Sequence, residues 1–139
     1  MPEFSEISKQ RLSTCDQRLQ DIFNEAIKFV DFIVIVGHRG QADQEAAFAA
    51  GKSQKHWPDG NHNASPSRAV DIAPYVPDVQ IDWHDVPAFG RLMGYIERIA
   101  DEKGIKLRFG IDWNGDWRTV GFDPKEHFLD APHVELIDP

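Results

Sequence analysis

Two short segments, residues 62–71 and 130–135, constrain the fold most, because each sets an imidazole and a carboxylate among strand-like apolar residues. A hydrolytic zinc site takes three protein ligands from His, Asp, Glu or Cys, keeps an open position for water, and has a carboxylate nearby that accepts the water's proton. His62, Asp71 and His133 can supply the three ligands, and Asp130 can supply the base. The fold must then bring the two segments together.

Each of these residues also has a plainer interpretation. His62 lies in a polar segment, where a solvated histidine is common. Asp71 stands between Val70 and Ile72, so its carboxylate must be exposed, salt-bridged or metal-bound, since an unpaired buried charge is costly. His133 could be a structural histidine with satisfied hydrogen bonds.

The chain of 139 residues is long enough for one domain with one core. We therefore expect a single domain over residues 1–139, with no separate cell-wall-binding domain. The one cysteine, Cys15, excludes an intramolecular disulfide and a cysteine-based zinc site, so a metal would be held by His and carboxylates.

The amino-terminal half predicts helices and one strand. The apolar spacing over residues 5–30 predicts one or two amphipathic helices, with Ser5 and either Ser13 or Asp16 as caps. The apolar run of residues 32–36 is typical of a central, buried strand. A short helix over residues 42–50 and a long loop over residues 52–67 follow.

The rest of the chain predicts three strands and the strongest helix. Residues 68–73 form a strand with Asp71 on the face opposite Val70 and Ile72, and residues 86–103 form an amphipathic helix that covers the sheet. A short strand over residues 107–109, a loop over 111–125 and a last strand over 132–137 complete the pattern. His133 and Glu135 share one face of that last strand, so Glu135 is either a rival base or a carboxylate that orients the imidazole. These elements predict an α+β fold: a small antiparallel-rich sheet with helices on one face and a zinc cleft on the other.

The charge of the chain limits its partners. With 23 acidic and 15 basic residues the net charge is -8, which argues against nucleic acid as a partner. The first residues lack the basic and apolar regions of a signal peptide, and no apolar run is long enough to span a bilayer. We expect a monomer without a membrane anchor.

Residues 112–116, with Asp123 further on, imitate the opening of a calcium loop. The imitation is incomplete, because glycine is the fourth residue where an EF-hand has it sixth, and Asp123 stands where that loop has a bidentate Glu. The pattern favours an ordinary Trp-containing loop at the rim of a cleft.

The motifs resemble those of the M15 family of zinc peptidases, most closely phage endolysins of the L-alanyl-D-glutamate endopeptidase type. The family pattern is a His, then Ala-x-Asp, here Ala69-Val70-Asp71, and a carboxyl-terminal Asp/Glu-x-x-His, here Asp130 to His133. The loop between His62 and Asp71 is two residues longer than in many members. Upstream, the resemblance rests on residues 36–39, Gln44 and residues 50–53.

The resemblance implies a zinc-dependent peptidoglycan endopeptidase. It would hydrolyse the bond between L-Ala and D-Glu of the stem peptide through a metal-activated water and a carboxylate base. Without a signal peptide, such an enzyme would wait in the host cytoplasm and act on the wall at phage lysis. The alternatives are a D-Ala-D-Ala carboxypeptidase or dipeptidase, which uses the same ligands, and a non-catalytic wall-binding or virion module that keeps the fold.

A stem peptide is rich in carboxylates, and a guanidinium can bind a carboxylate through two hydrogen bonds. Arg39 and Arg68 are therefore candidate substrate-binding residues, although surface salt bridges explain them equally well. Ser65 and Gln44 could donate hydrogen bonds to substrate, or serve as loop and capping residues.

Overall fold

The computed structural model describes residues 2–137. Two helices open the chain, α1 (Glu6–Leu12) and α2 (Gln17–Ala26). The Ser5 hydroxyl accepts a hydrogen bond from the Ser8 amide, and the Asp16 carboxylate accepts one from the Arg18 amide, so each helix begins at a side-chain cap. Both predicted helices and two of the three candidate caps are confirmed, while Ser13 ends α1.

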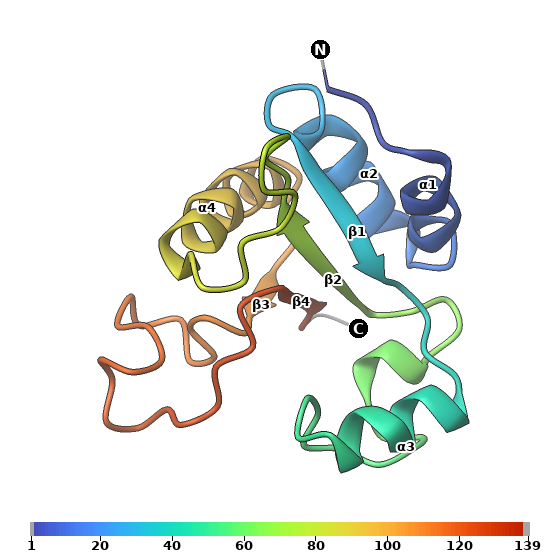
Figure 1. Cartoon of the computed structure of the whole chain (residues 1–139), viewed down its shortest axis with the longest axis vertical. Helices are drawn as coiled ribbons and strands as arrows, with labels where there is room; N and C mark the ends of the chain where they lie inside the picture. Colours follow the sequence, from blue (N-terminus) through green and yellow to red (C-terminus); the bar gives the residue numbers. More distant parts are fainter. Residues whose placement is uncertain (1, 138–139) are drawn as a thin grey trace.

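Four strands form one fully antiparallel sheet in the order β1-β2-β4-β3 (Figure 1). The strands are β1 (Phe32–Val36), β2 (Ala69–Pro74), β3 (Leu107–Phe109) and β4 (His133–Leu136). The register sets Asp71 of β2 directly opposite His133 of β4. The predicted α+β class is confirmed, and the pairing of β2 with β4 is what joins the two segments on which the sequence analysis rests.

The position predicted for β1 is wrong, because this strand lies at an edge of the sheet and not at its centre. Helix α1 covers the free edge: the Val34 amide donates to Ser8 Oγ at 3.1 Å, and Arg11 Nη1 donates to the Val34 carbonyl at 3.0 Å. The run is continuously apolar because both faces of β1 are packed: Phe32 and Val34 lie in the main core, and Ile33 and Ile35 pack against a second cluster.

Three further helices complete the fold: α3 (Gln41–Ala49), the 3-10 helix η1 (Asn61–Asn63) and α4 (Val86–Glu102). Asp85 caps α4 through the Ala88 amide, and Gly104, just past its end, has a φ of 70°, a conformation that suits glycine. In Figure 1, α3 and the long segment between β3 and β4 lie at the same end of the sheet, on either side of β4.

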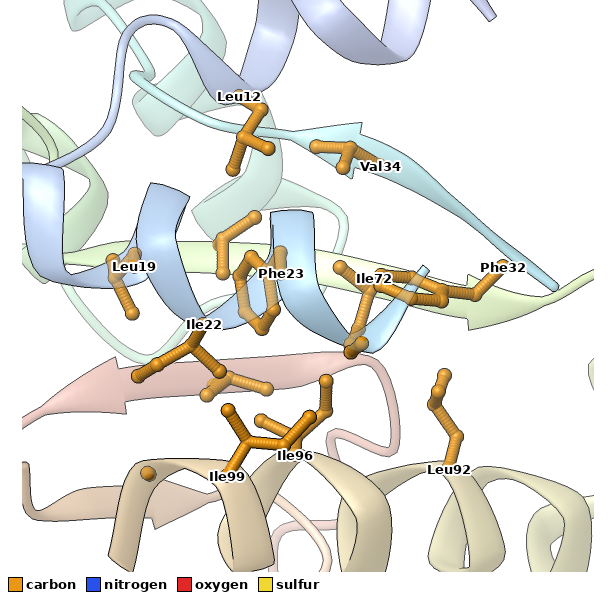
Figure 2. Close-up of a cluster of buried hydrophobic side chains, with 14 of the residues drawn as sticks. Leu12, Leu19, Ile22, Phe23, Phe32, Val34, Ile72, Leu92, Ile96 and Ile99 are labelled. Atoms are coloured by element: carbon orange, nitrogen blue, oxygen red, sulfur yellow. The ribbon is translucent and has the colours of Figure 1, made fainter. Parts of the chain in front are cut away.

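The main core lies between one face of the sheet and helices α1, α2 and α4 (Figure 2). Val70 and Ile72 of β2 and Val134 and Leu136 of β4 point into it. In Figure 2 the labelled side chains of α2, such as Phe23, and those of α4, such as Ile96, converge on the same space. Because side chains alternate between the two faces of a strand, Asp71 of β2 and His133 of β4 point to the opposite face of the sheet.

Within residues 2–137, no helix combines the length and the apolar character needed to cross a membrane.

Candidate active site

His62 is held at one end of the sheet by the backbone of Gly37, the residue that follows β1. Its Nδ1 lies 2.8 Å from the carbonyl of Gly37, which can only accept, so Nδ1 donates to it and Nε2 faces the other way. His62 Nε2 lies 3.2 Å from Asp71 Oδ1, close enough to donate to that carboxylate whenever it carries a proton. Only glycine fits at position 37, because a Cβ there would collide with the Arg11 carbonyl and the Thr14 hydroxyl near the end of α1. The close approach of α1 thus fixes the carbonyl that orients His62.

His133 is held in the same manner by a carboxylate. Its Nε2 lies 2.7 Å from Glu135 Oε1, and its Nδ1 lies 3.3 Å from Asp71 Oδ1. Arg108 of β3 holds Glu135 in turn, with 3.3 Å between Nη1 and Oε2. Each imidazole therefore uses one nitrogen for an anchor and turns the other toward Asp71, the arrangement in which histidines ligate metals.

The ligand atoms of His62, Asp71 and His133 lie within 4.8 Å of one another, and this group could hold a metal ion. All three residues are at most 9% exposed. Neutral imidazole nitrogens and one carboxylate oxygen suit zinc better than calcium or magnesium, which prefer oxygen ligands. The donor set therefore fits the ion that the sequence predicts.

The charges of this group stabilise one another. Burial acts to raise the pKa of Asp71, but hydrogen bonds from His133 and His62 outweigh it and hold that pKa well below its usual range. Burial acts to lower the pKa of His133, but hydrogen bonds to Asp71 and Glu135 raise it to about 9. In the metal-free protein, a protonated His133 thus provides the positive charge beside Asp71 that a bound metal ion would otherwise provide.

Asp130 stands beside the group, with Oδ2 3.7 Å from His133 Nδ1. Its backbone is fixed between β3 and β4: the Asp130 amide donates to the Gly110 carbonyl at 3.0 Å, and a Cβ on Gly110 would collide with the Asp130 carbonyl. Burial, and then the negative charge of Asp71, raise the pKa of Asp130 to about 6. A carboxylate whose pKa lies close to neutrality is well suited to general acid–base chemistry.

Arg39 follows β1 and reaches the same group. Its Nη2 lies 3.6 Å from Asp71 Oδ2, and its Nη1 donates to Gln44 Oε1 at 3.2 Å. Gln44 is 1% exposed, and its amide nitrogen donates to Ser53 Oγ and to the Lys55 carbonyl. The amide N–H groups of Gln44 are thus already bonded, and the side chain holds Arg39 and the 53–55 loop in place.

The other two predicted substrate-binding residues lie apart from this group. Arg68 begins the β2 segment, and its guanidinium donates to the Leu136 carbonyl at 3.4 Å. Ser65 is exposed in the loop after η1. Neither lines the cavity beside the two histidines.

That cavity has a volume of about 480 Å³ and exposes Asp130, His62, His133 and Arg39 to a ligand. Trp113 forms part of its wall: the indole lies 5.3 Å from the His133 ring and donates through Nε1 to the Phe128 carbonyl at 2.6 Å. Sequence reasoning placed Trp113 at the rim of a cleft but gave no sign that it would contact a candidate ligand.

A second acidic group lies in the loop that carries Trp113. Carboxylate oxygens of Asp112, Asp116 and Glu126 lie within 4.8 Å of one another, and this group too could hold a metal ion. Asp112 Oδ1 and Glu126 Oε2 are buried, and neither has a hydrogen-bond partner among residues 2–137. Asp123, which the sequence placed in a calcium-like loop, is not in the group and accepts from Asn114 and from the Lys125 amide instead.

A buried His-Asp-His group that could hold a metal ion lies beside a separate carboxylate, and both histidines and that carboxylate line one cavity of a small α+β fold. This arrangement is typical of peptidases that use a metal-bound water. The comparisons with known proteins name the family. The chain belongs to the phage L-alanyl-D-glutamate peptidase family, whose model matches residues 2–137.

Two relatives illustrate the match. The L-alanyl-D-glutamate peptidase of Escherichia phage T5 is 34% identical, and the alignment covers 97% of this chain and 98% of the phage protein. The crystal structure of the Serratia marcescens L-Ala D-Glu endopeptidase ChiX superposes with a TM-score of 0.73 at 23% identity, covering 96% of this chain and 90% of the other. That structure supports the fold, and the phage sequence supports the family.

Proposed function

We propose that the protein is a zinc-dependent endopeptidase that cuts the bond between L-Ala and D-Glu in the stem peptide of peptidoglycan. The observation that carries the proposal is the convergence of His62, Asp71 and His133 beside Asp130, with both histidines and Asp130 lining one cavity. The phage T5 relative is named for a peptidase of the same bond.

His62 Nε2, His133 Nδ1 and an oxygen of Asp71 would hold the zinc ion. When bound, zinc polarises a carbonyl and makes water a stronger acid. The Gly37 carbonyl and Glu135 would keep both imidazoles in the tautomer that ligates, because each accepts from the opposite ring nitrogen.

Asp130 would move the proton. The attacking water adds its oxygen to the L-Ala carbonyl carbon and gives a proton to the Asp130 carboxylate. As the C–N bond breaks, Asp130 passes that proton to the nitrogen of D-Glu, so that L-Ala leaves as a carboxylate and D-Glu as an amine. The raised pKa of Asp130 supports both transfers, because a group with a pKa of about 6 can accept and release a proton near neutral pH.

Arg39 would bind the oxyanion or a carboxylate of the substrate, since its guanidinium is fixed at the centre of the site by Asp71 and Gln44. Gln44 would act through Arg39. Arg68 and Ser65 remain candidate contacts for a longer substrate that extends beyond the cavity.

The family is one of phage peptidases, and we propose a role in phage lysis: the protein would accumulate in the host cytoplasm and reach the wall when the inner membrane is opened. We also propose that it acts as a monomer, which the coverage of the β1 edge by α1 supports.

Mass spectrometry of purified peptidoglycan tests the function. Zinc-loaded protein should produce new carboxyl-terminal L-Ala and amino-terminal D-Glu, and a chelated sample should not. Released D-Ala would instead identify a carboxypeptidase, and the absence of any metal-dependent product would favour the non-catalytic module.

A further inference from the structure

The candidate metal centre lies between two cavities. One, of about 480 Å³, contains the two histidines, and the other, of about 640 Å³, contains Asp71. Arg39, Lys52, Phe128 and Asp130 line both. A peptide whose scissile bond lies at Asp130 would therefore have one half in each cavity.

The cavity on the histidine side carries cationic side chains. Five cationic side chains line it, those of Arg39, Lys52, Lys55, Arg108 and Lys125, against three carboxylates, those of Glu126, Asp130 and Glu135. Arg108 is paired with Glu135, whereas within residues 2–137 neither Lys55 nor Lys125 forms an ion pair. This excess of positive over negative side chains, in a chain of net charge -8, favours an anionic ligand in this cavity.

The cavity on the Asp71 side has a different character. Apart from Asp71 and three of the four shared residues, all its lining residues are apolar, among them Ile35, Val36 and Leu129. Its wall includes Trp83, from the segment between β2 and α4. A neutral ligand with apolar groups fits this half better than an anionic one.

Trp83 is placed as a flat surface for that ligand. Its ring stacks on Phe89 of α4, with centroids 5.9 Å apart and planes 25° from parallel, and 52% of the residue is nevertheless exposed. One face of the indole is thus supported from behind while part of the residue remains open to solvent. Aromatic faces of this kind pack against the C–H groups of sugar rings.

The two halves of a stem peptide differ in the same way. On the amino side of the scissile bond, the L-Ala nitrogen is acylated by the lactyl group of muramic acid, so this half is uncharged and leads to a sugar ring. On the other side, D-Glu keeps a free carboxylate and the following residues add further carboxylates.

We propose that the stem peptide crosses the centre in one direction, with its muramoyl-L-Ala half in the Asp71-side cavity against Trp83 and its carboxylate-rich half in the histidine-side cavity near Lys55 and Lys125. Trp83 is then a specificity-determining residue that recognises the glycan end of the substrate. This inference rests on the proposed function.

The test compares two synthetic substrates that share the scissile bond: N-acetylmuramoyl-L-Ala-γ-D-Glu-diaminopimelate and N-acetyl-L-Ala-γ-D-Glu-diaminopimelate. With zinc-loaded full-length protein, we expect kcat/KM to be about tenfold higher for the muramoyl substrate. Trp83→Leu keeps an apolar side chain over Phe89 but lacks the flat ring, and it should reduce the ratio of the two kcat/KM values to about one, chiefly by lowering kcat/KM for the muramoyl substrate. Trp83→Phe should keep most of the preference.

Tyr95→Leu is the matched control, because Tyr95 is 42% exposed on α4 and lines neither of the two cavities. It should leave the sugar preference intact. Thermal unfolding of Trp83→Leu shows whether the variant is folded.

In the histidine-side cavity, Lys55→Gln and Lys125→Gln should each lower kcat/KM about threefold for substrates with a carboxyl-terminal carboxylate but not for the corresponding amide.

The outcomes separate this inference from the proposed function. Cleavage of both substrates with a sugar preference that Trp83→Leu leaves unchanged would overturn the role of Trp83. A Trp83→Leu effect that follows the terminal carboxylate, and not the sugar, would reverse the direction of the peptide. If the wild-type protein cuts neither substrate, the proposed function itself is wrong.

Discussion

The two faces of the central sheet bury neighbouring residues of the same strands by different physical means. Val70, Ile72, Val134 and Leu136 are at most 2% exposed in a hydrocarbon core. Asp71, His133 and Glu135, which alternate with them, are 9%, 7% and 6% exposed. The apolar face gains stability from burial itself, whereas each polar group on the other face must be matched with a partner. Substitutions should therefore lower stability on the first face and change chemistry on the second.

The largest effect is expected from His62→Ala. Removing one of three ligands should abolish stoichiometric zinc binding and with it the hydrolysis of peptidoglycan. Zinc content by atomic absorption and product release measure the two losses, and His84→Ala, an exposed histidine in the segment before α4, is the control. Unchanged zinc content in His62→Ala would show that another residue is the first ligand.

Asp130→Asn should separate activity from stability. Loss of the base should lower kcat about a thousandfold while zinc stays bound, because general acid–base catalysis contributes about a hundredfold to ten-thousandfold. Full activity in this variant would exclude Asp130 as the base.

The same variant should be more stable than wild type at neutral pH when both are metal-free. Burial and the charge of Asp71 raise the folded pKa of Asp130 from 3.8 to about 6, so wild-type stability falls as pH rises through this interval. The advantage of Asp130→Asn should be about 2 kcal/mol at pH 7 and disappear near pH 4. Chemical denaturation in chelator at the two pH values measures it, and an advantage independent of pH would contradict this origin.

On the apolar face, Ile72→Ala should lower the free energy of unfolding by about 3 kcal/mol, the usual cost of a cavity in a core. Ile72 is 0% exposed and does not line either cavity, so the folded fraction should retain wild-type kcat. Val79→Ala, at a site 57% exposed, should change stability by less than about 0.5 kcal/mol. A loss of kcat in fully folded Ile72→Ala would mean that the two faces are coupled.

Glu135→Gln should have an intermediate effect. The amide oxygen can still accept from His133 Nε2, but the negative charge that strengthens this bond and pairs with Arg108 is lost. Zinc affinity should fall about ten- to a hundredfold. If kcat instead falls a thousandfold with zinc fully bound, Glu135 and not Asp130 is the base.

The smallest effect concerns the second acidic group, which has no imidazole to balance its charge. Glu126→Gln keeps the oxygen that accepts from the Asn114 amide and removes one charge next to Asp112 and Asp116. Unfolding in chelator should show stabilisation of about 1 kcal/mol relative to wild type, with the exposed Glu3→Gln as control. Destabilisation that appears only with divalent cations present would mean that this group holds an ion.

Much of this contrast could be predicted from local sequence. Alternation along residues 69–74 and 133–136 separates Asp71 and His133 from their apolar neighbours, and a period of two settles which face each takes. Helix α4 could also be predicted, because apolar residues recur along one side of it and Gly104 marks its end. The signal is strong wherever it depends on neighbours in the chain.

The features that the sequence could not show concern contacts between distant segments. The sequence of β1 could not show that α1 covers its edge, since Ser8 and Arg11 look like ordinary helix-surface residues. The sequence also could not show that the Gln44 side chain is already bonded, because its partners Ser53, Lys55 and Asn63 meet it only in the fold. The contact of Gly110 with the Asp130 backbone could not be predicted for the same reason.

The covered edge of β1 also bears on how the protein behaves when it accumulates. An open strand edge is a template for pairing with other chains, and here Ser8 and Arg11 occupy the Val34 amide and carbonyl that such a partner would need. The opposite edge, β3, has only three residues. The molecule can therefore be crowded at high concentration with little tendency to extend its sheet from one copy to the next, and shortening the amino terminus into α1 would remove that protection against aggregation.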